Sequence, residues 1–420
     1  MTGRWTVNRR GDWRLASALA TIWLIMLVFG AMVIQPWRPE VPLKNDFVSF
    51  WTGSVLVRDG VGPKLYDMTI QSNFQAKLRR DLTGSAEMKP GVVLDPFHSP
   101  PAQAVLMVPL TLLPLPVAYL LWSALSLGLF WLAVALPLRG SSRGATLTVL
   151  LLSFASVADT LIFGQVNALF AIAISAALVA FSSGRPFVGG LWLGLMWLKP
   201  QYAVLFPIVF LLKRRWAELW GVAISGAVVG GISLAVVGFD GAARYLNVMR
   251  EIGAFYPPSD SFIFPQSMVN WRGFLVNVWP GIPGDVGSAL MLILDALTAG
   301  ASLLVWRGLW EPGSPRFAWQ FLATTIATIL ISPHSNFHGM VLLLGPLALM
   351  LSRPMKDVPF HRVSGLLLVA GYVMALAIWP FKIYSWLLVP LFLAAMAVLI
   401  IQCRAPAATS SGRLVLHPQQ

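Results

Sequence analysis

Residues 186–212, PFVGGLWLGLMWLKPQYAVLFPIVFLL, contain two apolar runs that flank a lysine and a proline. As helices, the runs 186–198 and 201–212 would each cover about 20 Å at about 1.5 Å per residue, which is less than a hydrocarbon core about 30 Å thick. Lys199 and Pro200 therefore form the tip of a shortened hairpin that ends at bilayer depth.

Two further hairpins share this design of short apolar arms and polar tips. Their arms are 145–158 with 168–181, and 317–331 with 339–351. Polar groups at bilayer depth are tolerated only where they are buried in protein or line a wet cavity. Alternating the spans from an inside N-terminus directs all three tips outward, so the sequence predicts a cavity in the outer half of the membrane.

The composition makes the bilayer the solvent for most of the chain. Hydrophobic residues make up 57% of the 420 positions and charged residues 11%, which is too much apolar surface for a soluble domain to bury. The net charge of +13 is dispersed between apolar runs, which is typical of the positive-inside bias and of contact with anionic headgroups. We therefore expect membrane lipids as partners and no nucleic acid. The single cysteine, Cys403, excludes an intramolecular disulfide.

Twelve apolar runs predict an all-α, polytopic membrane protein. They fall at about 15–34, 117–137, 145–158, 168–181, 186–198, 201–212, 217–238, 286–306, 317–331, 339–351, 363–381 and 384–401. Most basic residues lie in the links predicted to be cytoplasmic, and the short outer links carry only Lys199 and Lys382. We expect about twelve transmembrane helices in a bacterial inner membrane, cytoplasmic termini, and one domain over 1–420 with outer loops at about 35–116 and 239–285.

The first outer loop is expected to contain interfacial helices. Phe47, Trp51 and Val55 recur four residues apart, which is typical of an amphipathic helix that lies in the interface with its aromatic side chains in lipid. A second helical stretch ends near Arg80, and a proline-rich apolar segment begins after His98. We expect that segment to be a re-entrant or interfacial helix.

Asp46 is the carboxylate that the sequence places closest to the predicted cavity, because it follows the first span by about twelve residues and opens the first interfacial helix. An aspartate there is also a common helix N-cap, and a cap carboxylate can still face a cavity. Asp159 is the alternative carboxylate, although its position at a hairpin tip favours a hydrogen-bonding tie between hairpins. Asp67 and Asp95 lie deeper in the long loop, where nothing in the sequence directs them into the cavity.

Lys199 lies at membrane depth, where a lysine costs about 2.5–3.5 kcal/mol on insertion scales unless it is paired or hydrated. Either its side chain extends to the outer interface, or it binds an anionic group such as phosphate; the short arm before it favours phosphate. His334 and His338 suit phosphate or a sugar hydroxyl better than a metal, because no third ligand is adjacent. Neutral amides suit sugar hydroxyls or ties between the tips. These amides are Gln165, Asn167, Gln201 and Gln266. Arg272 is a further polar residue in the same long loop as Gln266. Glycine-rich phosphate loops are absent from the sequence, and we expect neither metal nor cofactor.

An ordered series of short motifs runs from residue 46 to about residue 340. The motifs are Asp46-Phe47 through Phe50-Trp51 to Leu65-Tyr66-Asp67, Ser99-Pro100-Pro101 with Pro109-Leu110 and Leu113-Pro114, Phe163-Gly164-Gln165-Val166-Asn167, Gly189 through Gly194 to Lys199-Pro200-Gln201, Gln266-Ser267, and Ser332-Pro333-His334. In this order they resemble glycosyltransferase family 87, polytopic membrane enzymes of the GT-C class that include polyprenyl-phosphate-mannose-dependent mannosyltransferases. The last third of the chain matches only in hydropathy.

The resemblance implies a GT-C-like fold and a transferase that moves a hexose such as mannose from a polyprenyl-phosphate sugar to a lipid or glycan hydroxyl on the outer face. The aspartate of the first outer loop, here Asp46, would be the general base. The expected donor-phosphate ligands are Lys199, His334 and His338, and the expected substrate ligands are Gln165, Asn167, Gln201 and Gln266. A transporter or flippase is the alternative, because broken helices and polar midplane groups also mark transporters. The tips that open on one side, and the lack of recognisable sequence repeats, favour the transferase.

Overall fold

A computed structural model describes residues 9–84, 95–258, 263–352 and 361–404 of the chain. Within these ranges the protein is helical, and its one β-type pairing is an isolated bridge between Met268 and Asn336. The prediction of an all-α fold is therefore confirmed.

The structure has both α-helices and short 3-10 helices. The α-helices are α1 (Arg9–Ile34), α2 (Phe47–Arg58), α3 (Met68–Thr83), α4 (Pro101–Met107), α5 (Leu115–Ala135), α6 (Gly144–Leu152), α7 (Ala155–Phe163), α8 (Asn167–Ser182), α9 (Pro186–Gly194), α10 (Leu205–Leu212), α11 (Trp216–Gly253), α12 (Trp271–Val278), α13 (Gly284–Leu304), α14 (Pro315–Ile331), α15 (Leu344–Leu351), α16 (His361–Ile378) and α17 (Leu388–Arg404). The 3-10 helices are η1 (Pro42–Lys44), η2 (Gly62–Lys64), η3 (Val108–Leu112), η4 (Leu195–Leu198), η5 (Pro200–Tyr202), η7 (Pro265–Ser267), η8 (Phe337–Leu343) and η9 (Lys382–Leu387).

Four helices of the described chain are long and apolar enough to cross a membrane: α5, α11, α13 and the stretch Lys382–Cys403. The pair α6 and α7, bent by 52°, makes a fifth if it is one span. Three of the predicted short arms are confirmed as the short apolar helical stretches Pro186–Leu198, Pro200–Leu212 and Phe337–Leu351. The arms in α8 and α14 are longer than predicted, with 16 and 17 residues, and the arm at 145–158 falls on the bent pair. The full set of twelve spans stays a prediction.

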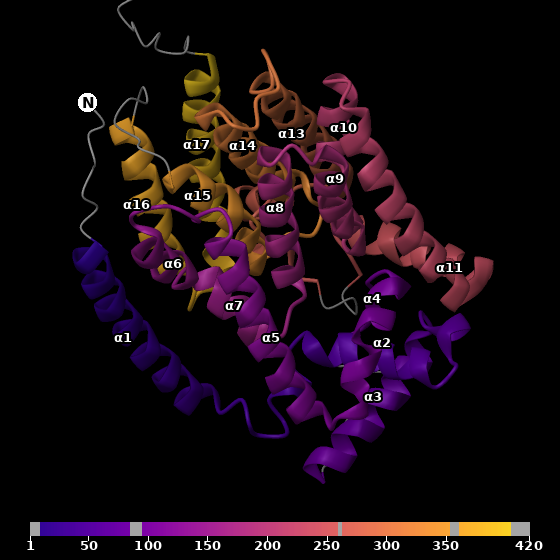
Figure 1. The fold of residues 1–420 in the computed structure, drawn as a ribbon. Helices are drawn as coiled ribbons and strands as arrows, with labels where there is room; N and C mark the ends of the chain where they lie inside the picture. Colours follow the sequence, from indigo (N-terminus) through magenta and orange to yellow (C-terminus); the bar gives the residue numbers. More distant parts are fainter. Residues whose placement is uncertain (1–8, 85–94, 259–262, 353–360, 405–420) are drawn as a thin grey trace, which may run out of the picture.

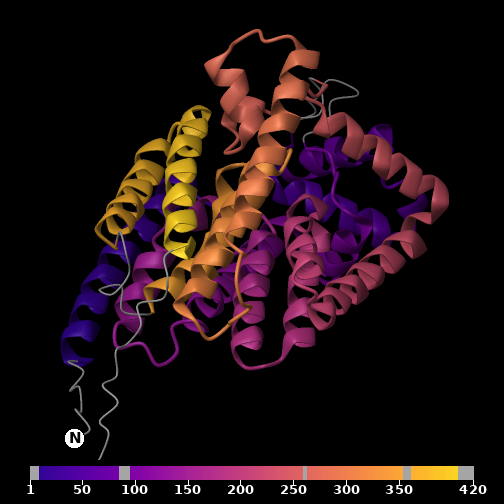
Figure 2. The same cartoon turned by 90° about the horizontal axis from the view of Figure 1, so that it is seen from above.

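The helices separate two ends of the molecule. The helices α8, α9, α14 and α17 run roughly along one direction, whereas α2, α3 and α4 gather at the lower end of Figure 1. In the same view α17 ends at the upper end, and α1 begins at about half height and runs downward. Seen from above, α11 runs along one edge of the molecule, opposite α1, α16 and α17 (Figure 2).

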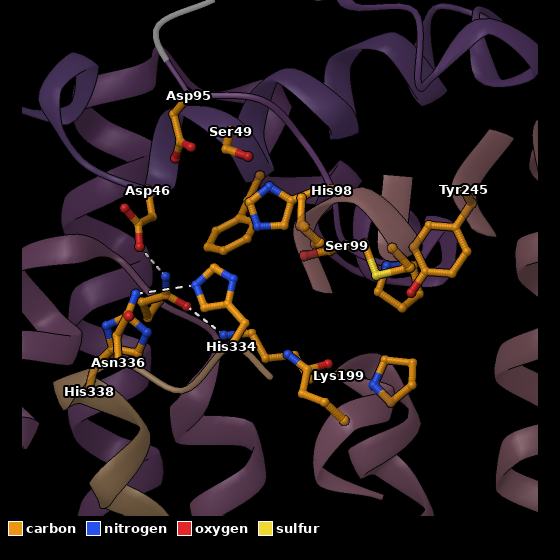
Figure 3. A pocket seen from close by; sticks show the side chains of 17 residues that line it. Asp46, Ser49, Asp95, His98, Ser99, Lys199, Tyr245, His334, Asn336 and His338 are labelled. Carbon is orange, nitrogen blue, oxygen red and sulfur yellow. Dashed lines mark hydrogen bonds between the residues drawn. The ribbon is translucent and has the colours of Figure 1, made fainter. Parts of the chain in front are cut away.

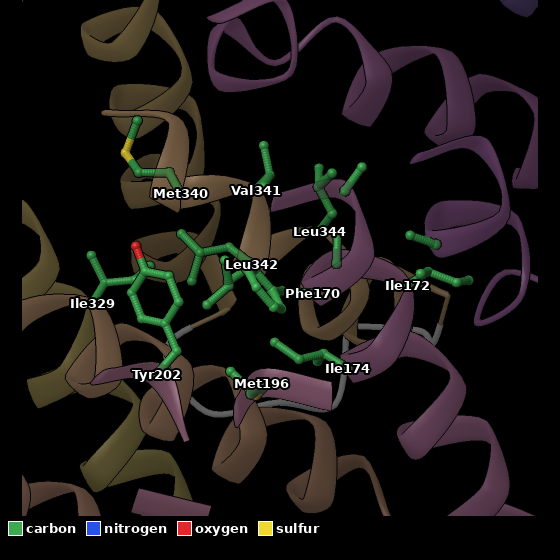
Figure 4. Close-up of a cluster of buried hydrophobic side chains, with 14 of the residues drawn as sticks. Phe170, Ile172, Ile174, Met196, Tyr202, Ile329, Met340, Val341, Leu342 and Leu344 are labelled. Atoms are coloured by element: carbon green, nitrogen blue, oxygen red, sulfur yellow. The ribbon is translucent and has the colours of Figure 1, made fainter. Parts of the chain in front are cut away.

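A buried apolar cluster holds two of the tips in place. The rings of Phe170 in α8 and Tyr202 in η5 lie 6.1 Å apart, and Val341 and Leu342 of η8 are buried in the same cluster (Figure 4). Burying one large apolar side chain contributes about 1.5–3 kcal/mol. Because Tyr202 directly follows Gln201, this packing fixes the tip that carries Lys199.

Two glycines determine the packing and the course of helix α11. A Cβ atom at Gly221 would lie 2.4 Å from the carbonyl oxygen of Phe187, so only glycine allows α9 to pack this closely against α11, as in other membrane helix pairs. At Gly238 the backbone has φ 68° and ψ −176°, which kinks the helix. The predicted span ends at this residue, but the helix continues past the kink to Gly253 and carries Tyr245 with it.

The first outer loop differs from its predicted form. Phe47 and Val55 are buried, so the prediction that this helical face lies in lipid is wrong. The ring of Phe47 packs 5.6 Å from that of Tyr119 in α5, and α4 and η3 pack against α2. The periodicity of α2 therefore reflects burial against protein. The second helical stretch is confirmed as α3, where the Asp67 side chain accepts hydrogen bonds from the backbone of Thr69 and Ile70.

Candidate functional site

One cavity collects most of the predicted polar residues (Figure 3). It is lined by Asp46, Gln165, Lys199, Gln201, His334 and His338. These side chains come from the start of α2, the turn between α7 and α8, the tip between η4 and η5 with η5 itself, and the segment that leads into η8 with the first turn of η8. The three tips that the sequence predicted to converge therefore do so, together with the first outer loop.

Lys199 is held by neutral amides. Its Nζ donates hydrogen bonds to Oε1 of Gln165 at 2.9 Å and to Oδ1 of Asn167 at 3.0 Å. The Nε2 of Gln165 in turn donates to Oδ2 of Asp46. No carboxylate of the described ranges forms an ion pair with Lys199. Its side chain therefore points to the amides of the cavity and not to the outer interface, and one hydrogen-bonded line joins the cation to Asp46.

Asp46 occupies the N-cap position of α2, but its side chain makes no capping hydrogen bond. The interpretation of this carboxylate as a cap is therefore wrong, and its oxygen is engaged by Gln165 instead. Close contact between the two loops sets this pairing, because a Cβ atom at Gly164 would lie 2.6 Å from Cβ of Phe47. Gly164 also has φ 62°, a conformation that favours glycine.

The tip before η8 is clamped by the second outer loop. Buried Arg272 donates to the carbonyl oxygens of Ile252, Ala254 and Pro333. Asn270 adds a bond of 2.7 Å to the carbonyl of Ser332. This clamp positions His334, which follows Pro333 in the tip and lines the cavity.

His334 and His338 do not share a helical face, because η8 begins only at Phe337. The ring of His334 lies 5.8 Å from that of His98, and its Nε2 is 3.3 Å from Nδ2 of Asn336. The Nδ1 of His338 faces Asp159 at 3.7 Å. In the described ranges no three His, Cys, Asp or Glu residues are placed to hold a metal ion.

Asp159 ties hairpins together, as its position predicts. Its carboxylate forms an ion pair with Lys382 and accepts a hydrogen bond of 3.2 Å from Nε1 of Trp379. It lines a second cavity of about 420 Å³, which shares Asp46 and His338 with the first. Gln266 lines neither cavity and is exposed, so the structure does not bring it together with the other predicted residues. The backbone carbonyl of Gln266 accepts a hydrogen bond of 3.1 Å from Nδ2 of Asn277, and the next residue of η7, Ser267, lines the second cavity.

Sequence reasoning missed Asp95, which lines both cavities (Figure 3). Its backbone N–H donates to Oε1 of Gln75 at 3.1 Å, and its carbonyl accepts from Nε2 of the same side chain at 2.8 Å. Gln71, one turn earlier in α3, makes the same two contacts with Phe97. Two buried glutamines four residues apart in a predicted helix were the available signal, since such amides need partners.

Burial, together with the charge of Asp46, raises the pKa of Asp95 well above its usual range. Burial also lowers the pKa of His98, which favours its neutral ring beside Lys199.

Tyr245 is a further residue of the site that the sequence did not predict. It lines the first cavity, and its buried hydroxyl has no hydrogen-bond partner in the described ranges. The site thus presents two carboxyl groups, a cation without an ion-pair partner in the described ranges, and neutral histidine and tyrosine side chains.

Comparisons with known proteins agree with this arrangement. A model of glycosyltransferase family 87 matches residues 97–333. The polyprenol-phosphate-mannose-dependent alpha-(1-2)-phosphatidylinositol pentamannoside mannosyltransferase of Mycolicibacterium smegmatis is 28% identical over 356 residues, which cover 81% of this chain and 78% of that relative. The protein of the same description from Mycobacterium tuberculosis is 28% identical over 282 residues, or 64% of this chain and 62% of the relative. No solved structure matches. Because the family model covers more than half of its residues, this chain is a multi-pass membrane glycosyltransferase that belongs to glycosyltransferase family 87.

Proposed function

We propose that the protein transfers a mannose-like hexose from a polyprenyl-phosphate sugar to a lipid or glycan hydroxyl on the outer face of the inner membrane. The relatives are named as dependent on polyprenol-phosphate-mannose and as acting on a phosphatidylinositol mannoside, which supports a lipid-phosphate donor and a sugar-bearing acceptor. The observation that carries the proposal is the hydrogen-bonded line from Asp46 through Gln165 to Lys199. The family model and both relatives are named as glycosyltransferases, which favours a transferase over a transporter or flippase.

Asp46 is the general base in this proposal. The acceptor oxygen forms a bond to the anomeric carbon while the bond from that carbon to the phosphate oxygen breaks, and the configuration inverts. The hydroxyl proton passes to the Asp46 carboxylate, and the electron pair leaves with polyprenyl phosphate. One positioned base suffices for such a step.

Lys199 stabilises the departing phosphate. A preorganised cation in a water-poor site is worth more than in water, and here it has no carboxylate to neutralise it. Asn167 lines neither cavity, so in this proposal it acts on the donor only through Lys199, whose Nζ it holds with its Oδ1. His334 adds a ring at the same wall, whereas His338 has only its Nε2 free to face the cavity.

The transferase proposal is tested by Asp46→Asn, which replaces the basic carboxylate with a non-basic amide of the same shape. We expect turnover to fall by about 10²–10⁴-fold while the donor lipid still binds. Asp81→Asn is the matched control, because Asp81 is exposed on α3 and lines neither cavity. Transfer at the wild-type rate by Asp46→Asn would reject the base assignment, and Asp95 would be tested next.

For the topology we propose twelve spans in one domain, 1–420, with both termini cytoplasmic. In Figure 1 the first residues of α1 and the last residues of α17 both point away from α2–α4. This supports placing both termini on the side opposite to the first loop. In a Cys403→Ser background, Gln266→Cys should react with an impermeant thiol reagent from the outside and Ser142→Cys only from the inside. Both positions are exposed. Reaction of both cysteines from the same side contradicts the topology.

A further inference from the structure

The second cavity meets the first at a shared wall. Both are lined by Asp46, Asp95, Asn336 and His338. A transferase needs two substrates whose reacting atoms meet at the base, so a second cavity that opens on the same carboxylates is suited to the second substrate. Its volume of about 420 Å³ lies within the range of about 300–1,000 Å³ typical of small-ligand sites.

The charges of the second cavity fit a neutral ligand. Lys382 is paired with Asp159, and its Nζ also lies 3.7 Å from the centroid of the Phe163 ring. This cation is therefore already compensated, in contrast to Lys199. Lys44, which is exposed, also lines the cavity, and the two lysines are balanced by the carboxylates of Asp46 and Asp159. Phe264, which is 64% exposed, adds an aromatic surface of the kind that packs on the C–H face of a pyranose ring.

Asp95 is held in a way that leaves its side chain for a ligand. Its backbone N–H and carbonyl are both bonded to Gln75, and the carbonyl of the following Pro96 accepts from the Ser49 hydroxyl at 2.9 Å. In the described ranges no hydrogen bond to the Asp95 carboxyl is present. A rigid backbone with a free carboxyl at a cavity wall is the arrangement expected of a residue that reads a sugar hydroxyl.

We propose that the second cavity binds the terminal sugar of the acceptor, a neutral pyranose, and that Asp95 binds a hydroxyl next to the one that Asp46 deprotonates. This inference rests on the proposed transferase function. The raised pKa of Asp95 favours its protonated form, which can both donate and accept a hydrogen bond to a sugar hydroxyl. The donor then approaches from the side of Lys199 and the acceptor from the side of Phe264.

Steady-state kinetics with polyprenyl-phosphate mannose as donor and octyl α-mannoside as acceptor test the assignment. Asp95→Ala should raise the acceptor KM about tenfold, the loss expected for one good hydrogen bond, without changing the donor KM. Asp95→Asn, which keeps a hydrogen-bonding group, should remain within about threefold. Phe264→Ala should also raise the acceptor KM; because the ring is exposed, its removal spares the fold. Asp81→Ala serves as the control for loss of a carboxylate.

The outcomes separate this inference from the proposed function. If the wild-type protein transfers mannose but neither Asp95→Ala nor Phe264→Ala raises the acceptor KM, the inference is overturned and the transferase stands. A rise in the donor KM alone would also overturn it, because the second cavity would then hold the donor. If the wild-type protein makes no product from polyprenyl-phosphate mannose, the proposed function and this inference fall together.

Discussion

Lys199 and Lys382 are the two basic residues of the links predicted to be short and outer, yet their surroundings are opposite. Lys382 forms an ion pair with the buried carboxylate of Asp159, whereas Lys199 is bonded only to the amide oxygens of Gln165 and Asn167. A buried charge must be paired or well hydrogen-bonded to be tolerated. Lys382 is therefore already neutralised and links hairpins, whereas the charge of Lys199 remains available to an anion.

The largest expected difference between the two lysines is in catalysis. Lys199→Met should lower kcat/KM for the donor by about 10²–10³-fold, because it removes a charge that stabilises the leaving phosphate. Lys199→Arg should retain part of the activity, since it keeps the charge with another shape. Lys77→Met, on the exposed face of α3, is the matched control. Equal kinetics for Lys199→Met and the control would remove the distinction between the two lysines.

The second expected difference is in ligand-induced stability. Polyprenyl phosphate at about 100 times its dissociation constant should stabilise the wild-type protein by about 2.7 kcal/mol, seen as a higher Tm in detergent. The same addition should still stabilise Lys382→Met but should have little effect on Lys199→Met. Equal stabilisation of both variants would show that the phosphate does not distinguish the two cations.

The third difference concerns folding. Lys382→Met leaves the Asp159 carboxylate without its cation, and we expect a loss of about 1–3 kcal/mol in unfolding free energy, between the values for surface and buried pairs. The double variant Asp159→Asn with Lys382→Met should recover most of that loss, because no charge is then left unpaired. Denaturant or thermal unfolding in detergent measures both variants. A double variant as unstable as the single one would refute the ion-pair explanation.

The smallest expected effect belongs to a third buried cation, Arg272. It also lacks a carboxylate partner in the described ranges, but its two terminal nitrogens are bonded to three backbone carbonyls and only its Nε is without a partner there, so most of its hydrogen-bonding capacity is used without a ligand. Arg272→Lys keeps the charge but loses the planar fork, and we expect a loss of about 1 kcal/mol in stability. Polyprenyl phosphate should still raise the Tm of this variant. Loss of that response would place Arg272 with Lys199 as an anion ligand.

Much of the site could be predicted because its residues lie at breaks in apolar runs. Lys199, Gln165 and Asn167 are recognisable as polar tips without knowledge of their neighbours, and the structure brings them together. Asp95 is not recognisable from its own surroundings in the sequence, because its place depends on the side chain of Gln75, twenty positions earlier in the chain. Tyr245 depends on the helix continuing past Gly238, where the hydropathy signal ends.

The fold shows the same limit. Helices and short arms follow from the length of apolar runs, but the burial of α2 does not, because a helix covered by protein and a helix lying in lipid have the same periodicity. Phe47 is buried only because α4 and α5 lie beside it. Which partner covers an apolar face is a property of tertiary structure.

The contact between Phe47 and Gly164 has an evolutionary consequence. Positions 46 and 165 are joined by a hydrogen bond, and the adjacent positions 47 and 164 touch at a distance that leaves no room for a Cβ atom. Two loops more than a hundred residues apart are therefore matched pair by pair. A larger residue at position 164 would displace both Phe47 and Gln165, the partner of Asp46. We therefore expect substitutions at positions 46, 47, 164 and 165 to be correlated among family members, and substitutions at 164 alone to be very rare.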